Sequence, residues 1–136
     1  MQYLQGLPHF LGYLIGALVL LIAFMYCYSR ITPHNEWTLI REGNVAAATA
    51  YAGSILGFTL PLYSAMANSV SFIDFILWGI IAFGVQLGAF FGLKMVLKNQ
   101  GESLSLHITE GHVAYGILVG SVSIAVGLIN AASMTW

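Results

Sequence analysis

The chain has 136 residues, of which 59% are hydrophobic and only 7% are charged, and its formal net charge is −1. Soluble domains carry about 25% charged residues and keep a polar face on each helix, so this composition excludes an ordinary soluble helical bundle. The single cysteine, Cys27, excludes an internal disulfide and a cysteine-based metal site.

Four apolar stretches are long enough to cross a bilayer, because a run of 18 or more residues without charge is typical of a membrane span. They are residues 10–28, 45–73, 75–93 and 112–136. The sequence therefore predicts an all-α integral membrane protein with four transmembrane helices in a single domain, residues 1–136. The residues before Pro8 include no Lys or Arg, so we expect a retained first helix, not a cleaved signal peptide, with Pro8 in its first turn.

The connections between the spans carry capping and anchoring signals. Asn35 is a plausible N-cap, and the following Trp37, Leu39 and Ile40 suit a short helix on the bilayer surface. Residues 99–109 are expected to form a second polar loop. Pro61 removes the hydrogen bond to the carbonyl of residue 57, so a bend is expected in the second span. Trp136 is expected to anchor the last span at the interface.

A repeated motif organises the chain. Residues 42–46 read Glu-Gly-Asn-Val-Ala, and residues 110–114 read Glu-Gly-His-Val-Ala, at an offset of 68 that is half of the 136-residue length. Self-similarity at a fixed offset indicates a duplicated unit. We therefore expect two parallel two-helix repeats, approximately residues 1–68 and 69–136, related by an axis along the membrane normal.

All four basic residues fall on the side of the two longer connections: Arg30, Arg41, Lys94 and Lys98. The positive-inside rule places these connections in the cytoplasm. Both termini are then expected on the outer, periplasmic side of a bacterial inner membrane.

Rows of small residues mark every span. Such rows let backbones approach closely in lipid, and helices with two such faces favour a homo-oligomer. The glycines expected to pack helices are Gly12, Gly16, Gly53, Gly57, Gly84, Gly88, Gly92, Gly116 and Gly120.

The repeated helix entrances are the best candidates for a polar site on the cytoplasmic side. The candidate residues are Glu42 and Asn44 in the first entrance and Glu110 and His112 in the second. The alternative is simple capping of helix N-termini, where a carboxylate is favoured by the helix dipole. His107 lies near the second entrance and suggests a metal, but the spacing matches no zinc signature, so no metal site or cofactor is predicted. No enzyme motif is present, which favours a protein without catalytic activity.

Several segments resemble the YjfL-like bacterial inner-membrane proteins, the family catalogued as domain of unknown function 350. These segments are residues 29–37, which include Thr-Pro-His-Asn-Glu, and the ending at residues 130–136, which reads Asn-Ala-Ala-Ser-Met-Thr-Trp. The resemblance covers nearly the whole chain. It implies a bacterial inner-membrane location and a duplicated two-helix unit, and it implies no particular activity.

Two functions of different class remain open. The first is an oligomeric four-helix membrane module that forms a passage or a binding site at the repeat interface. The second is a membrane anchor or scaffold that recruits a soluble cytoplasmic protein through its loops. The expected partners are the lipid bilayer and further copies of the chain, with no nucleic acid; an intramembrane enzyme is the weakest possibility.

Overall fold

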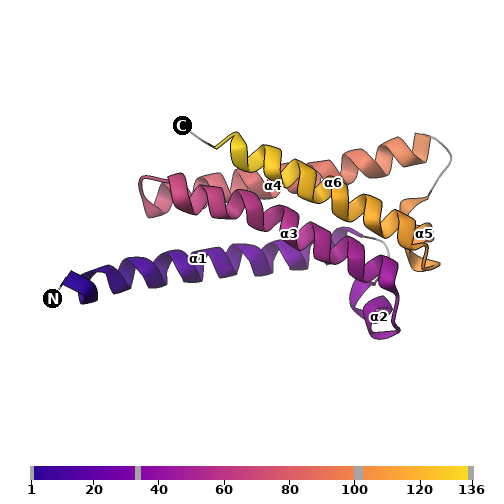
Figure 1. Cartoon of the computed structure of the whole chain (residues 1–136), viewed down its shortest axis with the longest axis horizontal. Helices are drawn as coiled ribbons and strands as arrows, with labels where there is room; N and C mark the ends of the chain where they lie inside the picture. Colours follow the sequence, from indigo (N-terminus) through magenta and orange to yellow (C-terminus); the bar gives the residue numbers. More distant parts are fainter. Residues whose placement is uncertain (1, 33–34, 100–102, 135–136) are drawn as a thin grey trace.

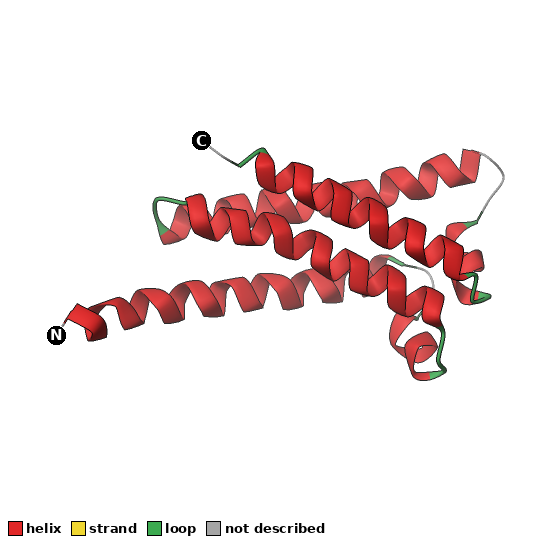
Figure 2. Ribbon diagram, in the orientation of Figure 1, coloured by secondary structure: helices red, strands yellow, loops and turns green. Residues whose placement is uncertain are grey.

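The computed structural model describes residues 2–32, 35–99 and 103–134. Within these ranges every regular element is a helix, as Figure 2 shows. In chain order the helices are α1 (Gln2–Ile31), α2 (Glu36–Arg41), α3 (Val45–Asn68), α4 (Phe72–Asn99), α5 (Leu104–Thr109) and α6 (Val113–Ala132).

The four long helices, α1, α3, α4 and α6, are each long and apolar enough to cross a membrane, which confirms the expected four spans of an integral membrane protein. Successive long helices run in opposite directions (Figure 1). As a result, α3 and α6 run the same way and lie side by side. The short helices α2 and α5 sit together at one end of the bundle, opposite the start of α1 and the end of α6.

Two expectations about the helices were wrong. Helix α1 begins at Gln2, so Pro8 lies inside the helix and not in its first turn. A proline there only removes the bond to the carbonyl of Leu4, a loss that a helix end tolerates. Residues 104–109 form helix α5 and not an open loop, because the side chain of Ser103 caps the helix and Leu104 and Ile108 are buried one turn apart. Trp136 lies outside the described residues.

The centre of the bundle is the contact between α3 and α6, where the two backbones touch. A Cβ atom added at Gly53 would collide with the backbone of Gly120, and one added at Gly116 would collide with the backbone of Ala46. In lipid no hydrophobic force drives helices together, so close van der Waals packing over small residues has to hold such a pair. Helix α3 is accordingly the most buried of the four spans. In its apolar 18-residue stretch 56% of the residues are buried inside the bundle, against 11% for α1.

Pro61 is accommodated by this same contact. Helix α3 continues through Pro61, whose missing N–H leaves the carbonyl of Gly57 without its usual partner in the helix. The oxygen of that carbonyl lies against Gly127 of α6, at the place where the Cβ atom of any larger residue at position 127 would be. Thr59 and Ser64 bond other carbonyls, those of Ile55 and Ala131. The neighbouring helix, through Gly127, therefore makes room for the freed carbonyl; sequence reasoning did not single out Gly127.

Aromatic side chains attach the outer helices to this centre. Phe24 of α1 stacks on Phe58 of α3 with ring centroids 4.6 Å apart, and Phe83 of α4 packs edge-on against both. Near the opposite end Tyr13 of α1 stacks on Phe75 of α4 at 5.3 Å. The remaining faces of α1 and α4 expose large apolar side chains, which suits helices that border lipid.

The glycine rows divide into two groups. Gly53, Gly57, Gly116 and Gly120 lie at the α3–α6 contact, and Gly16 faces the rings of Phe72 and Phe75. An added Cβ meets nothing within 4 Å at the remaining row positions, Gly12, Gly84, Gly88 and Gly92. Packing within one chain therefore does not use this second group, because α4 turns its glycine face away from its neighbours.

We expect Gly127→Ala to lower stability by about 1–3 kcal/mol, the usual range for overpacking, because its methyl group would collide with the Gly57 carbonyl. Gly84→Ala is the matched control, since its methyl group enters open space and alanine gains up to about 1 kcal/mol in a helix. Thermal unfolding of both variants in detergent measures the difference. Equal melting temperatures would contradict the packing described for α3 and α6.

Candidate functional site

The two helix entrances have the same backbone design. Glu42 is the C-cap of α2, and Gly43 follows it with φ +85°. Glu110 is the C-cap of α5, and Gly111 follows it with φ +82°. This left-handed conformation strains any residue with a Cβ, so glycine is required at both turns. The structure thus places both glutamates at the ends of short helices as well as two residues before the N-caps of the spans.

The residues after these glycines behave differently in the two entrances. Asn44 is the N-cap of α3, and its side-chain oxygen accepts a hydrogen bond of 3.0 Å from the backbone N–H of Ala47. His112 is the N-cap of α6 but forms no side-chain cap bond. At the first entrance the side chain of Asn44 therefore acts as an ordinary helix cap, whereas at the second the ring of His112 makes other contacts.

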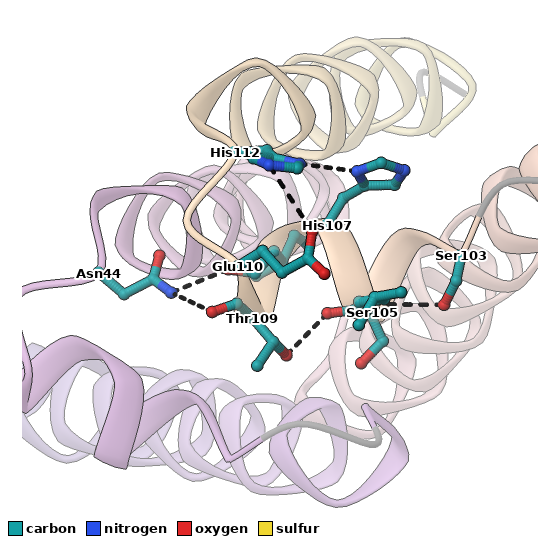
Figure 3. A network of polar contacts seen from close by, with 9 residues as sticks. Asn44, Ser103, Ser105, His107, Thr109, Glu110 and His112 are labelled. Atoms are coloured by element: carbon teal, nitrogen blue, oxygen red, sulfur yellow. Dashed lines mark hydrogen bonds and ion pairs between the residues drawn. The ribbon is translucent and has the colours of Figure 1, made fainter.

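Asn44 also joins the two entrances, as Figure 3 shows. Its side-chain amide donates hydrogen bonds to the backbone carbonyls of Ile108 at 2.8 Å and Thr109 at 3.3 Å, both in α5. One side chain thus satisfies the start of α3 and the end of α5. Among the residues that the structure describes, no hydrogen bond or ion pair joins Glu42 to Glu110.

Three side chains meet at the second entrance: those of His107, Glu110 and His112. The Nδ1 atoms of the two histidines lie 2.7 Å apart, and Nε2 of His112 lies 3.7 Å from a carboxylate oxygen of Glu110. The ring of His107 stacks on Tyr115 with centroids 4.0 Å apart and planes 2° from parallel. One ligand atom from each of the three can be chosen so that all lie within 4.8 Å of one another.

A groove runs between α2 and α5 at the same end of the molecule. Its volume is about 580 Å³, and it is open to the outside. Its polar lining consists of hydroxyl groups, one amide and one carboxylate, from Asn35, Thr38, Glu42, Ser103, Ser105 and Thr109, and Leu39 and Leu106 complete it. No basic side chain is among these lining residues. Sequence reasoning missed the groove because it treated residues 99–109 as a loop.

A second hollow, of about 560 Å³, lies beside α1, α2 and α3. Its wall includes Trp37, Tyr51 and Arg30, and the guanidinium of Arg30 lies 5.4 Å from the ring centre of Tyr26. The neighbouring Glu36, in the first turn of α2, is only 2% exposed. This end of the molecule therefore combines aromatic and charged groups near the expected membrane surface.

Polar side chains within the spans are tied into the contacts between helices. The amide nitrogen of Gln86 in α4 donates to the backbone carbonyl of Ser123 in α6 at 3.1 Å. Asn130 donates to the carbonyl of Ala82, and the hydroxyls of Ser54 and Ser123 lie 3.4 Å apart. These groups bind α3, α4 and α6 to one another, as expected for polar residues in lipid.

Comparison with known proteins places these features in a family. The family model described as Domain of Unknown Function (DUF350) matches residues 2–134. The chain is 40% identical to UPF0719 inner membrane protein YjfL of Escherichia coli (strain K12) over 136 residues, which is all of both chains. It is 24% identical to UPF0719 transmembrane protein YshE of Bacillus subtilis (strain 168) over 123 residues, 90% of each chain. No solved structure matches. With its four apolar helices, the chain is a multi-pass inner membrane protein that belongs to the DUF350 family.

Proposed function

We propose that this protein is an oligomeric membrane module that binds a small organic cation on its cytoplasmic side, in the groove between α2 and α5. The observation that carries the proposal is the exposed carboxylate of Glu42 among hydroxyl and amide groups, in a groove whose lining includes no basic side chain among the described residues. A carboxylate and several hydrogen-bond acceptors suit a positively charged ligand that carries N–H or O–H donors.

We further propose that the groove is the interface between two repeats, residues 1–68 and 69–136. The short helices begin and end 68 residues apart, at 36 and 104 and at 41 and 109, and so do the starts of α3 and α6, at 45 and 113. The parallel α3–α6 contact, in which Gly53 meets Gly120, supports an axis along the membrane normal. A ligand in the groove would then touch both repeats at once.

The orientation follows from the distribution of basic residues. Arg30 ends α1, Arg41 ends α2, and Lys94 and Lys98 lie in the last turns of α4, all at the end of the molecule that carries α2 and α5. The positive-inside rule favours the cytoplasm for this end. Both chain termini then lie on the periplasmic side.

The oligomer is inferred from the uncovered glycines of α4. Gly84, Gly88 and Gly92 are spaced four residues apart and lie in the middle of an exposed apolar face. A glycine costs about 1 kcal/mol relative to alanine in a helix, and facing lipid it gains no packing in return. A second helix seated on the row would use the close approach that these glycines permit, which favours a contact between copies of the chain.

A binding site is favoured over a passage through a single chain. The side chains of Gln86 and Asn130 bridge α4 and α6 by hydrogen bonds, and the hydroxyl of Ser123 in α6 lies 3.4 Å from that of Ser54 in α3. None of these side chains lines the four main hollows of the described residues. A passage would therefore have to run between copies. The role of an anchor for a soluble protein rests only on the half-exposed Trp37 and Leu106 and has less support.

Topology is tested with a reporter that is active only in the cytoplasm. Fused after Trp136, it should stay silent, because the positive charges hold the opposite end of the bundle inside. Fused after Gln100 of a truncated chain, it should be active and serves as the matched control. Activity of the C-terminal fusion would overturn the orientation.

Assembly is tested with Gly88→Leu, measured by light scattering on a sizing column in detergent. We expect a smaller particle with an unchanged melting temperature, because the leucine blocks contacts between copies and meets nothing within the chain. Gly53→Leu should instead prevent folding, since it separates α3 from α6. Val96→Leu, on the exposed flank of α4, is the neutral control. An unchanged particle for Gly88→Leu would argue against assembly through this row.

Binding is tested by titrating the purified protein with ethanolamine and methylammonium, with glycerol and acetate as neutral and anionic comparisons. We expect only the cationic solutes to raise the melting temperature, since ligands that bind the native state stabilise it. Glu42→Gln should abolish the shift and Glu110→Gln should retain it, because only Glu42 lines the groove. Equal shifts for the parent and Glu42→Gln would reject the site.

A further inference from the structure

We propose that His107, Glu110 and His112 form a binding site for a divalent transition-metal ion, with Zn²⁺ as the best fit, at the start of α6. This site goes beyond the proposed groove, which α5 lines with Ser105, Leu106 and Thr109. His107 instead packs toward α6 through its stack on Tyr115 (Figure 3 shows the three ligand residues).

The first argument is the way the three side chains converge. Nδ1 of His107 and Nδ1 of His112 are 2.7 Å apart, so one ring donates its N–H to the lone pair of the other, with a single hydrogen atom between the two nitrogens. A cation can occupy that place instead. Glu110 stands on the other side of the His112 ring, 3.7 Å from Nε2, and its side chain is 49% exposed and therefore free to turn toward an ion.

The second argument is that His112 does not serve the helix on which it stands. The N-cap position of α6 would normally supply a side-chain acceptor for a backbone N–H, as Asn44 does for α3 at the matching position. His112 makes no such bond, and its two ring nitrogens face His107 and Glu110. His112 therefore does not stabilise the start of α6 as a cap would. Its contacts with two other possible metal ligands are better explained by a role in binding.

The third argument is the difference between the two halves of the chain. At the offset of 68, His107, His112 and Tyr115 match Leu39, Asn44 and Ala47 of the first half. Only the glutamate is the same in both, as Glu42 and Glu110. Both imidazole groups of the cluster, and the tyrosine ring that stacks on one of them, therefore belong to the second entrance, and the first entrance has no counterpart at the matching positions.

The donor set selects the kind of metal. Two imidazoles and one carboxylate are a usual set for Zn²⁺ with an open fourth position, and imidazole is a poor ligand for Mg²⁺ and Ca²⁺. Zinc–nitrogen bonds of about 2.0–2.1 Å in a tetrahedral site put ligand nitrogens roughly 3.3 Å apart. The two rings would have to separate by about 0.6 Å, which the exposed position of His112 allows. The stacked Tyr115 would hold the ring of His107 in place as the ion binds.

The experiment uses the full chain, purified in detergent without a histidine tag, and titrates it with Zn²⁺ by calorimetry and with Co²⁺ by visible absorption. We expect one ion per chain and a Co²⁺ spectrum with ligand-field bands, which report nitrogen and oxygen ligands in a site of low coordination number. Mg²⁺ should not compete.

Two variants take their new residue from the matching position of the first half. His112→Asn should weaken Zn²⁺ binding at least tenfold while the melting temperature without metal is kept or raised, because asparagine supplies the missing cap. His107→Leu should weaken binding equally. Glu110→Gln should weaken it as well, whereas Glu42→Gln should leave it unchanged, so a failure of this site is distinct from a failure of the groove.

Binding to other histidines is tested with the combined variant His9→Asn and His34→Asn, which should bind Zn²⁺ like the parent chain. Zn²⁺ affinity that is unchanged in His112→Asn and His107→Leu, or lost with His9 and His34, would overturn the proposal. So would the absence of any Zn²⁺ binding by the parent protein at millimolar concentration.

Discussion

The structure depends on the direct contact between the backbones of α3 and α6. Gly53, Gly57, Gly116 and Gly127 each leave space that the other helix fills with its own backbone. In a bilayer this close approach replaces the hydrophobic driving force of a soluble core. A side chain at any of these positions would push the two helices apart, and α1 and α4 would lose the surface against which their aromatic residues pack.

The same contact determines what lies at the end of the bundle that carries α2 and α5. Since α3 and α6 run the same way and touch along their length, their entrances are neighbours, and so are the short helices that precede them. Asn44 fixes this arrangement by capping α3 while it bonds the last carbonyls of α5. The groove lies on one side of α5, and the histidine pair lies on the side that faces α6.

The two entrances show how one backbone design can carry different chemistry. Gly43 and Gly111 have nearly equal positive φ angles, so the turn itself is the same. Asparagine completes the first turn as a structural cap, whereas histidine at the same place leaves the cap unmade and turns to His107 and Glu110. In the first entrance the polar side chain contributes stability, and in the second it is available for binding.

The sequence by itself determined the four spans, because low charge over a long stretch is a local property of the chain, and it determined the offset of 68, because the repeated motif can be read directly from the residues. It also indicated caps at Asn35 and Asn44, which depend only on neighbours three residues away. Tertiary structure alone decided that α3 packs on α6, that Gly127 receives the carbonyl freed by Pro61, and that Gly88 faces outward. It also decided the groove and the convergence of the histidines, since residues 104–109 form helix α5 by burying Leu104 and Ile108 against the bundle. Spacing along the chain shows which residues are near in sequence, but the distance between side chains is set by how the helices pack.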